Sequence, residues 1–185
     1  MTTTPTVLYF YCKHDDAERD NFVALSRSIL AQLLRQDPGL LYYFYEKCCV
    51  NIEPILNSVL LIEELLSFAF QNCKSAYVIL DGLDECCSRS ERKHIVEWFR
   101  NLVESLPITE PERVRCFFVS QDDGIARKDM AGIATIRISV EDNKKDIENY
   151  CLIRAAQLKA DKGLTDEKAS TIAASVAKNA EGRPP

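Results

Sequence analysis

The chain has 185 residues, 46% of them hydrophobic and 28% charged, which is enough to bury one sizeable core with a small helical appendage. Its formal net charge is −5 and its lysines and arginines are scattered, so a basic surface for nucleic acid is excluded and no nucleic-acid partner is expected. The longest apolar stretch, residues 59–70, is interrupted by two acids and is shorter than the roughly 18 residues of a membrane span. It predicts a buried helix rather than a membrane contact. With no basic segment ahead of the short apolar run 7–12, secretion is not indicated, and we expect a cytoplasmic protein.

The eight cysteines do not have the spacing of a zinc site or of a disulfide framework. Two pairs are vicinal, the others stand alone, no C-x-x-C occurs, and the chain has only two histidines. Cys12 and Cys116 fall in apolar strand patterns, where a reduced cysteine acts as a small hydrophobic residue. We therefore expect reduced thiols.

The first part of the chain predicts one strand followed by helices. Residues 7–12 are apolar and rich in aromatic side chains, which is typical of a strand. Apolar residues at steps of three and four predict a helix over 22–34, ended by Asp37-Pro38-Gly39. A shorter helix over about 40–48 and a long apolar helix over about 58–71 follow.

The next part alternates strands with a helix. Residues 75–80 predict a second strand, and Ser88 with Glu91 predicts a capping box that opens a helix closed by Pro107. Residues 114–119 predict a third strand. Because strands and helices alternate, we expect a parallel sheet covered by helices on both faces.

The last part predicts one more strand and two helices. Residues 133–138 alternate between apolar and polar, which predicts a strand at a sheet edge with one wet face. Asn143 is expected to cap a helix, and residues 165–178 predict a final helix rich in alanine. The end of the chain, 181–185, is expected to fray.

One segment combines a buried strand with an acidic turn. The apolar residues 77–80 lead directly into Asp81-Gly82-Leu83-Asp84-Glu85. A parallel strand that ends in Asp places the carboxylate at the carboxyl edge of the sheet, where α/β proteins bind ligands. This pattern is typical of a Walker B strand, which holds Mg²⁺ in P-loop NTPases. A plain strand end followed by solvated acids is the alternative.

The phosphate-binding partner of a Walker B strand is absent from these residues. None of the six glycines is followed by lysine, so the sequence contains no G-x-x-x-x-G-K-[ST] loop. Half of a nucleotide site is therefore present. No residue of the chain is assigned to phosphate or cofactor binding.

Four segments together resemble the NACHT-type STAND NTPases: residues 9–11, 25–34, 79–86 and 138–150. The chain is similar in particular to the nephrocystin-like N-terminal domain that is common in large fungal ankyrin, tetratricopeptide or WD-repeat proteins. The resemblance runs from about residue 7 to residue 182 and implies an α/β fold, an ASCE/STAND-type P-loop NTPase sheet with flanking helices.

The resemblance also implies that this core is incomplete. In the family a strand, the phosphate loop and its helix precede the strand matched at residue 7, and the fold continues beyond residue 182. We expect a disordered N-terminus over 1–6, a partial core over 7–142 without its first strand and phosphate loop, and C-terminal helices over 143–185 that lead out of the core. A missing central strand would expose unpaired backbone, so we expect protein partners or self-association.

Site residues follow from the resemblance position by position. Asp81 would hold Mg²⁺, and Asp84 and Glu85 would orient or deprotonate the attacking water. Ser120 and Gln121 occupy the place of a Ser-Arg sensor that reads the terminal phosphate. Glutamine has no positive charge to stabilise the transition state. Mg²⁺ with ATP or GTP is the cofactor set that the family implies, and without a phosphate loop we expect it not to bind tightly.

Three functions are compatible with these residues. The first is a partial NACHT-type domain that neither binds nor hydrolyses nucleotide alone, whereas intact relatives are nucleotide-dependent switches in signalling or nonself recognition. The second is a non-enzymatic interaction module that docks on full-length relatives. The third is a metal-dependent hydrolase built on Asp81, Asp84 and Glu85, with Asp122 and Asp123 as the nearest additional acids.

Overall fold

The computed structural model describes residues 5–51, 55–107, 109–110, 113–122 and 124–180. The chain divides into two compact units, residues 1–132 and residues 133–185. Of the expected disordered segment 1–6, residues 1–4 lie outside the described part, and Thr6 already belongs to the first strand. The expected frayed end at 181–185 also lies outside it.

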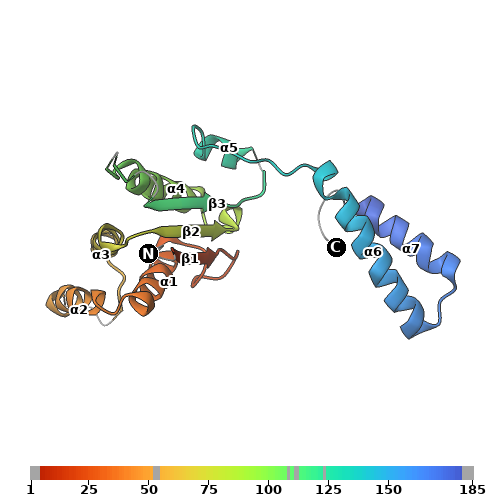
Figure 1. The fold of residues 1–185 in the computed structure, drawn as a ribbon, viewed down its shortest axis with the longest axis horizontal. Helices are drawn as coiled ribbons and strands as arrows, with labels where there is room; N and C mark the ends of the chain where they lie inside the picture. The colour runs from red at the N-terminus through yellow and green to blue at the C-terminus, as the bar shows by residue number, and fades with distance from the viewer. Residues whose placement is uncertain (1–4, 52–54, 108, 111–112, 123, 181–185) are drawn as a thin grey trace. The chain divides into compact units, whose positions relative to one another are not determined.

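The first unit is built on a parallel sheet (Figure 1). Its strands are β1 (Thr6–Tyr11), β2 (Ala76–Asp81) and β3 (Val114–Phe118), with β2 in the middle. In register, Tyr11 pairs with Asp81, and Leu80 pairs with Phe118. The three expected strands over 7–12, 75–80 and 114–119 are confirmed.

Five helices accompany these strands in the described part of the first unit: α1 (Phe22–Gln36), α2 (Leu40–Asn51), α3 (Val59–Asn72), α4 (Arg89–Glu104) and α5 (Ile125–Asp129). A short 3-10 turn, η1 (Leu83–Glu85), follows β2. The helices expected over 22–34, 40–48 and 58–71 are thus present.

Side-chain caps explain why the long helices begin where they do. Asn21 and Ser58 accept hydrogen bonds from backbone N–H groups of the first turns of α1 and α3. Ser88 caps α4 as expected, but the Glu91 carboxylate does not complete a capping box. Instead it accepts a hydrogen bond from the backbone N–H of Phe22, at 2.8 Å, and so ties the start of α4 to the start of α1.

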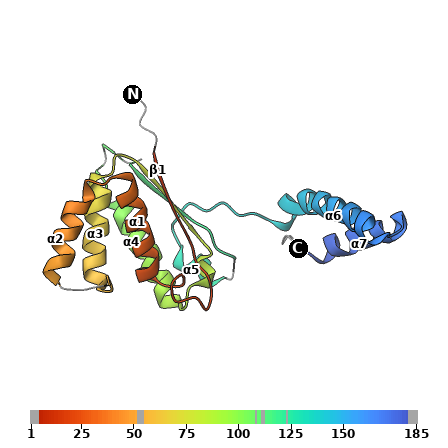
Figure 2. The same cartoon turned by 90° about the horizontal axis from the view of Figure 1, so that it is seen from below.

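The four longer helices lie on one face of the sheet (Figure 2). Both crossovers, β1 to β2 and β2 to β3, step in the same direction, and right-handed connections then place their helices on the same side. Alternate strand residues point into this layer and are fully buried, among them Leu8, Val78, Leu80 and Val114. Each such side chain contributes about 1.5–3 kcal/mol to the free energy of unfolding.

The other face of the sheet is not covered by any described helix of this unit, so the expectation of helices on both faces is wrong here. Exposed apolar side chains occupy it: Val7, Tyr9, Tyr11, Ile79, Phe117 and Val119. The strands are apolar on both faces, which is the sequence pattern of a doubly covered sheet. Because the two crossovers run in the same direction, however, they supply helices to one face only.

The strand expected over 133–138 does not form. Residues 134–139 have no regular secondary structure, and Ile136 is 93% exposed. An alternating pattern becomes a strand only where a neighbouring strand supplies backbone hydrogen-bond partners. Among the described strands, β3 pairs with β2 alone, and none pairs with residues 133–138.

The second unit is a helical hairpin of α6 (Val140–Lys162) and α7 (Asp166–Asn179), joined by residues 163–165. Helix α6 begins before the expected cap at Asn143, because Ser139 and Asp142 form a reciprocal capping box. Small side chains let the two helices pack closely: Ile147, Cys151, Ala155, Ala169 and Ala173 form the core. No helix in the described residues is long and apolar enough to cross a membrane.

Candidate functional site

The acidic turn lies where the three parallel strands end. Asp81 is the last residue of β2, the central strand, and its carbonyl accepts a hydrogen bond from the backbone N–H of Cys12 at 2.8 Å. On the other side, the backbone N–H of Val119 donates to the carbonyl of Leu80 at 2.8 Å. The turn therefore starts from a strand that is paired on both sides up to its final residue.

Gly82 lets the chain leave β2 sharply. Its φ of +72° lies in the left-handed region, which residues other than glycine adopt only at a cost in free energy. A Cβ atom at this position would also lie 3.1 Å from the carbonyl oxygen of Cys12. The glycine is therefore required both by the turn and by the closeness of β1.

Leu83 anchors the turn in the core. Its side chain is fully buried, and its backbone N–H donates to the carbonyl of Val119 at 3.1 Å. The N–H of Glu85 returns to the carbonyl of Gly82 at 2.8 Å and closes the 3-10 turn. The acids at 84 and 85 are thus held on a short, rigid loop.

Two of the three acids hold neighbouring strand ends. Oδ1 of Asp84 accepts a hydrogen bond from the backbone N–H of Gln121, just beyond β3, at 2.9 Å. Oε2 of Glu85 accepts one from the backbone N–H of His14, just beyond β1, at 3.1 Å. Charged acceptors make the stronger class of hydrogen bond, so the turn ties the ends of β1, β2 and β3 together.

Asp81 differs from the other two acids, because no hydrogen bond or ion pair to its carboxylate is recorded in the described residues. It also faces the uncovered side of the sheet, in register with Tyr11. Within the described part of the chain, no three His, Cys, Asp or Glu side chains are grouped so that they could hold a metal ion. Within the described residues, the three acids of the turn therefore do not form a cluster of metal ligands.

The expected sensor residues lie beside the turn but make local contacts. The hydroxyl of Ser120 donates to the carbonyl of Gln121 at 3.1 Å, and Gln121 contacts Asp84 through its backbone rather than its side chain. Asp122 is held by Arg127, whose Nε lies 2.5 Å from Oδ1. Asp123 lies outside the described residues.

A pair of buried thiols lies behind the turn. The sulfurs of Cys12 and Cys86 are 3.7 Å apart, and both side chains are buried. The hydrogen bond with Cys12, together with burial, raises the pKa of the Cys86 thiol, and burial raises the pKa of Cys116 to about 12. The thiols of Cys86 and Cys116 are therefore protonated at neutral pH and are poor nucleophiles. All cysteines whose state is described are free.

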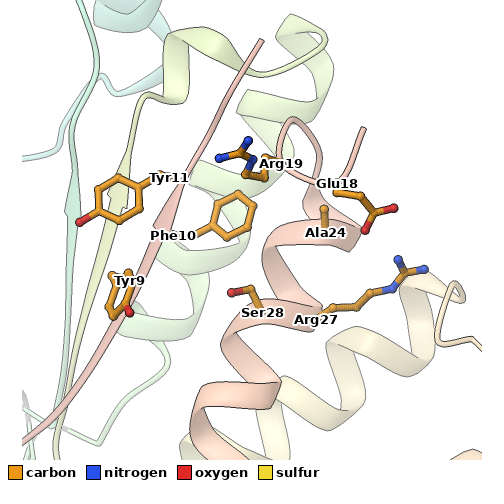
Figure 3. Close-up of a pocket in the computed structure, with 8 residues that line it drawn as sticks. All are labelled: Tyr9, Phe10, Tyr11, Glu18, Arg19, Ala24, Arg27 and Ser28. Carbon is orange, nitrogen blue, oxygen red and sulfur yellow. The ribbon is translucent and has the colours of Figure 1, made fainter. Parts of the chain in front are cut away.

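One cavity is not lined by any of the three acids of the turn (Figure 3). It has a volume of about 430 Å³ and runs between β1 and the start of α1, where Tyr11, Arg19 and Arg27 are among its lining residues. Both arginines have partners: Arg19 pairs with Asp16, and Arg27 donates to the carbonyl of Leu56. The third charged residue of the lining is Glu18.

Sequence reasoning found the acids but missed their partners. The donors to Asp84 and Glu85 are backbone N–H groups of Gln121 and His14, and every residue other than proline has such a group. No sequence pattern marks them. The available signal was that each of the two residues lies two positions after a predicted strand.

The fold and the turn define an α/β domain with a three-stranded parallel sheet flanked by helices and an acidic turn at its carboxyl edge. Within that class, the chain belongs to the nephrocystin 3 N-terminal family, whose family model matches residues 1–121. The matched range covers all three strands and the whole turn and ends at Gln121. No curated protein and no solved structure matches the chain.

Proposed function

We propose that the chain is a partial NACHT-type domain in which the acidic turn has become a structural element, and that it does not bind or hydrolyse nucleotide by itself. The hydrogen bonds of Asp84 and Glu85 to the ends of β3 and β1 carry this proposal. An oxygen that holds a backbone N–H is partly withdrawn from a metal ion or a water. The carboxylate of Asp81 by itself supplies too few ligands for Mg²⁺, which is coordinated by six oxygens. Mg²⁺ gives up its bound waters reluctantly and is usually held in place by substrate phosphates as well.

The phosphate side of such a site has no counterpart in the sequence. Tight binding needs backbone N–H groups around the phosphates and a lysine, and none of the glycines precedes a lysine. The sensor position carries Gln121, which is neutral. Transition-state charge would therefore lack a positive partner.

A titration with a fluorescent ATP analogue and Mg²⁺ tests this proposal on the full chain. We expect no binding in the micromolar range and no nucleotide hydrolysis. Micromolar binding that is lost in Asp81→Asn and kept in Asp142→Asn, an acid of α6 far along the chain, would show that the proposal is wrong. The Asp142 variant controls for the loss of one negative charge.

A second candidate function is an interaction module that docks on a full-length relative. The uncovered apolar face of the sheet favours it, because monomeric proteins rarely leave such faces wet. Co-purification with a full-length family member should be reduced by Tyr11→Lys on this face and unchanged by Tyr42→Lys on α2. Equal capture of both variants would exclude the face.

The third candidate function, a metal-dependent hydrolase, has less support. It requires two metal ions and several converging acids, yet two of the three acids of the turn hold backbone groups and Asp122 is paired with Arg127. We do not propose it.

A further inference from the structure

The two outer edges of the sheet differ in whether other groups bond to their backbone. On the outer edge of β1, the Gln32 carboxamide accepts from the N–H of Tyr9 at 3.1 Å and donates to its carbonyl at 2.8 Å, as a neighbouring strand would. Gln36 adds a donor to the carbonyl of Val7 at 3.4 Å. Helix α1 thus closes this edge with side chains.

The outer edge of β3 has no such cover among the described residues of the first unit. The carbonyl of Arg113 and both backbone groups of Val119 bond to the β2 side of the sheet. Backbone direction alternates along a strand, so Arg115 and Phe117 also face β2. The N–H and C=O groups of Val114, Cys116 and Phe118 therefore point outward, and no hydrogen bond from them to a described residue is recorded.

The sequence of β3 lacks the residues that usually prevent an edge strand from pairing with another strand. Natural edge strands are usually protected by lysine, proline, a bulge or a covering element. Residues 114–119 read Val-Arg-Cys-Phe-Phe-Val, with strong strand formers, one charge and neither proline nor glycine. Such a strand readily pairs with another.

We propose that β3 pairs with β3 of a second copy of this chain, so that two three-stranded sheets join into one. Closed two-fold symmetry requires this pair to be antiparallel. The register that uses every outward-facing residue centres on Cys116: Cys116 lies opposite Cys116 of the second copy, and Val114 lies opposite its Phe118. All the outward N–H and C=O groups of β3 then find partners.

The side chains of β3 are complementary in this register. On the uncovered face, Arg115 lies opposite Phe117 of the second copy, and the reverse contact is made by symmetry. The only charge of the strand therefore meets an aromatic ring, a favourable cation–π pairing, instead of meeting itself. Arg115 already lies over the ring of Tyr77, 6.0 Å from its centroid, and Phe117 is 51% exposed and available for cover.

The inference goes beyond the proposed function, because it requires no nucleotide and no relative. Sedimentation equilibrium of the full chain across a concentration series tests it. We expect a reversible dimer, together with concentration-dependent protection of the β3 amides against hydrogen exchange. Phe117→Lys places like charges opposite Arg115 twice and should raise the dissociation constant at least about tenfold.

Two further variants make the result specific. Tyr9→Lys is the matched control, since Tyr9 lies on the same face with 52% exposure but on the edge closed by Gln32, and the dimer should persist in it. Cys116→Pro removes an outward N–H while leaving the bonds to β2, and it should abolish the dimer. If this variant fails to fold, Phe117→Lys against Tyr9→Lys still decides the matter.

Three results would overturn the proposal. One is a 21.0 kDa monomer at every soluble concentration. Another is a dimer that Phe117→Lys leaves intact. The third is a dimer that Tyr9→Lys weakens as much as Phe117→Lys does, because the open face rather than the edge of β3 would then be the contact.

Discussion

The carboxylate of Asp84 accepts a hydrogen bond from the backbone N–H of Gln121 at 2.9 Å, although 37 residues separate them in sequence. This contact joins the acidic turn after β2 to the end of β3. Its counterpart joins Glu85 to His14 at the end of β1. An acidic turn that resembles a catalytic motif therefore has a structural role that can be measured without any nucleotide.

Asp84→Ala should lower the free energy of unfolding by about 1–2 kcal/mol, because the N–H of Gln121 loses its partner. Asp84→Asn should cost clearly less, since the amide oxygen of asparagine can accept the same hydrogen bond. Urea unfolding of the two variants and the wild type measures the difference. Equal losses would mean that the charge, and not the hydrogen bond, is what matters.

Gly82→Ala should destabilise the chain more than Gly124→Ala. Both glycines have φ of +72°, so both variants carry the left-handed backbone cost of about 1–2 kcal/mol. Only Gly82 would also place a Cβ 3.1 Å from the carbonyl oxygen of Cys12, whereas Gly124 has open space. Thermal unfolding of both variants isolates the contact with β1. Equal melting temperatures would show that β1 moves away at no cost.

Asp129 should make stability depend on acid pH. Its side chain is 2% exposed and bonds Arg89 at 2.9 Å and Arg92 at 3.2 Å, which joins α5 to α4. The hydrogen bond from Arg89, followed by the charges of both arginines, holds the pKa of this carboxyl below its usual value. A lowered pKa in the folded state means that the stabilisation is present above the unfolded-state pKa and is lost as pH falls through the folded-state pKa.

We therefore expect Asp129→Asn to cost about 1.5–3 kcal/mol at neutral pH and progressively less below about pH 4. Urea unfolding at a series of pH values measures the gap from the wild type. Asp122→Asn is the control, because its partner Arg127 is largely exposed and little change is expected. A gap for Asp129→Asn that stays constant as pH falls would rule out the ionised carboxylate as its cause.

Gln32→Leu should open the edge of β1. It removes both hydrogen bonds to the backbone of Tyr9 at a cost of about 1–2 kcal/mol, and the Tyr9 amide should exchange faster with solvent. Gln36→Leu removes one longer bond and should have a smaller effect. Hydrogen exchange followed by mass spectrometry of the β1 peptide measures both. Unchanged exchange in Gln32→Leu would mean that the carboxamide does not protect this edge.

Much of the fold could be predicted from local pattern. The strands near residues 7, 75 and 114 and the capped start of α4 at Ser88 were recognisable, because periodicity and capping depend on residues within a few positions of one another. The strand over 133–138 was wrong because its alternation needs a neighbouring strand. The prediction of a second helix layer was wrong because the face that each crossover helix covers depends on the order of the strands in the sheet. That order cannot be read from any single segment of the sequence.

For the candidate site, the sequence by itself determined which acids stand at the end of β2 and just after it, and that Gly82 and Leu83 separate Asp81 from Asp84. Only the tertiary structure decided that Asp84 and Glu85 accept hydrogen bonds from the ends of β3 and β1, whereas no described residue bonds the carboxylate of Asp81. It also decided that Gln32 closes one edge of the sheet, whereas no described residue of the first unit pairs with the other edge. The physical reason is that residue types set local chemistry, whereas hydrogen-bond partners far apart in sequence are set by the register of strands that meet only on folding.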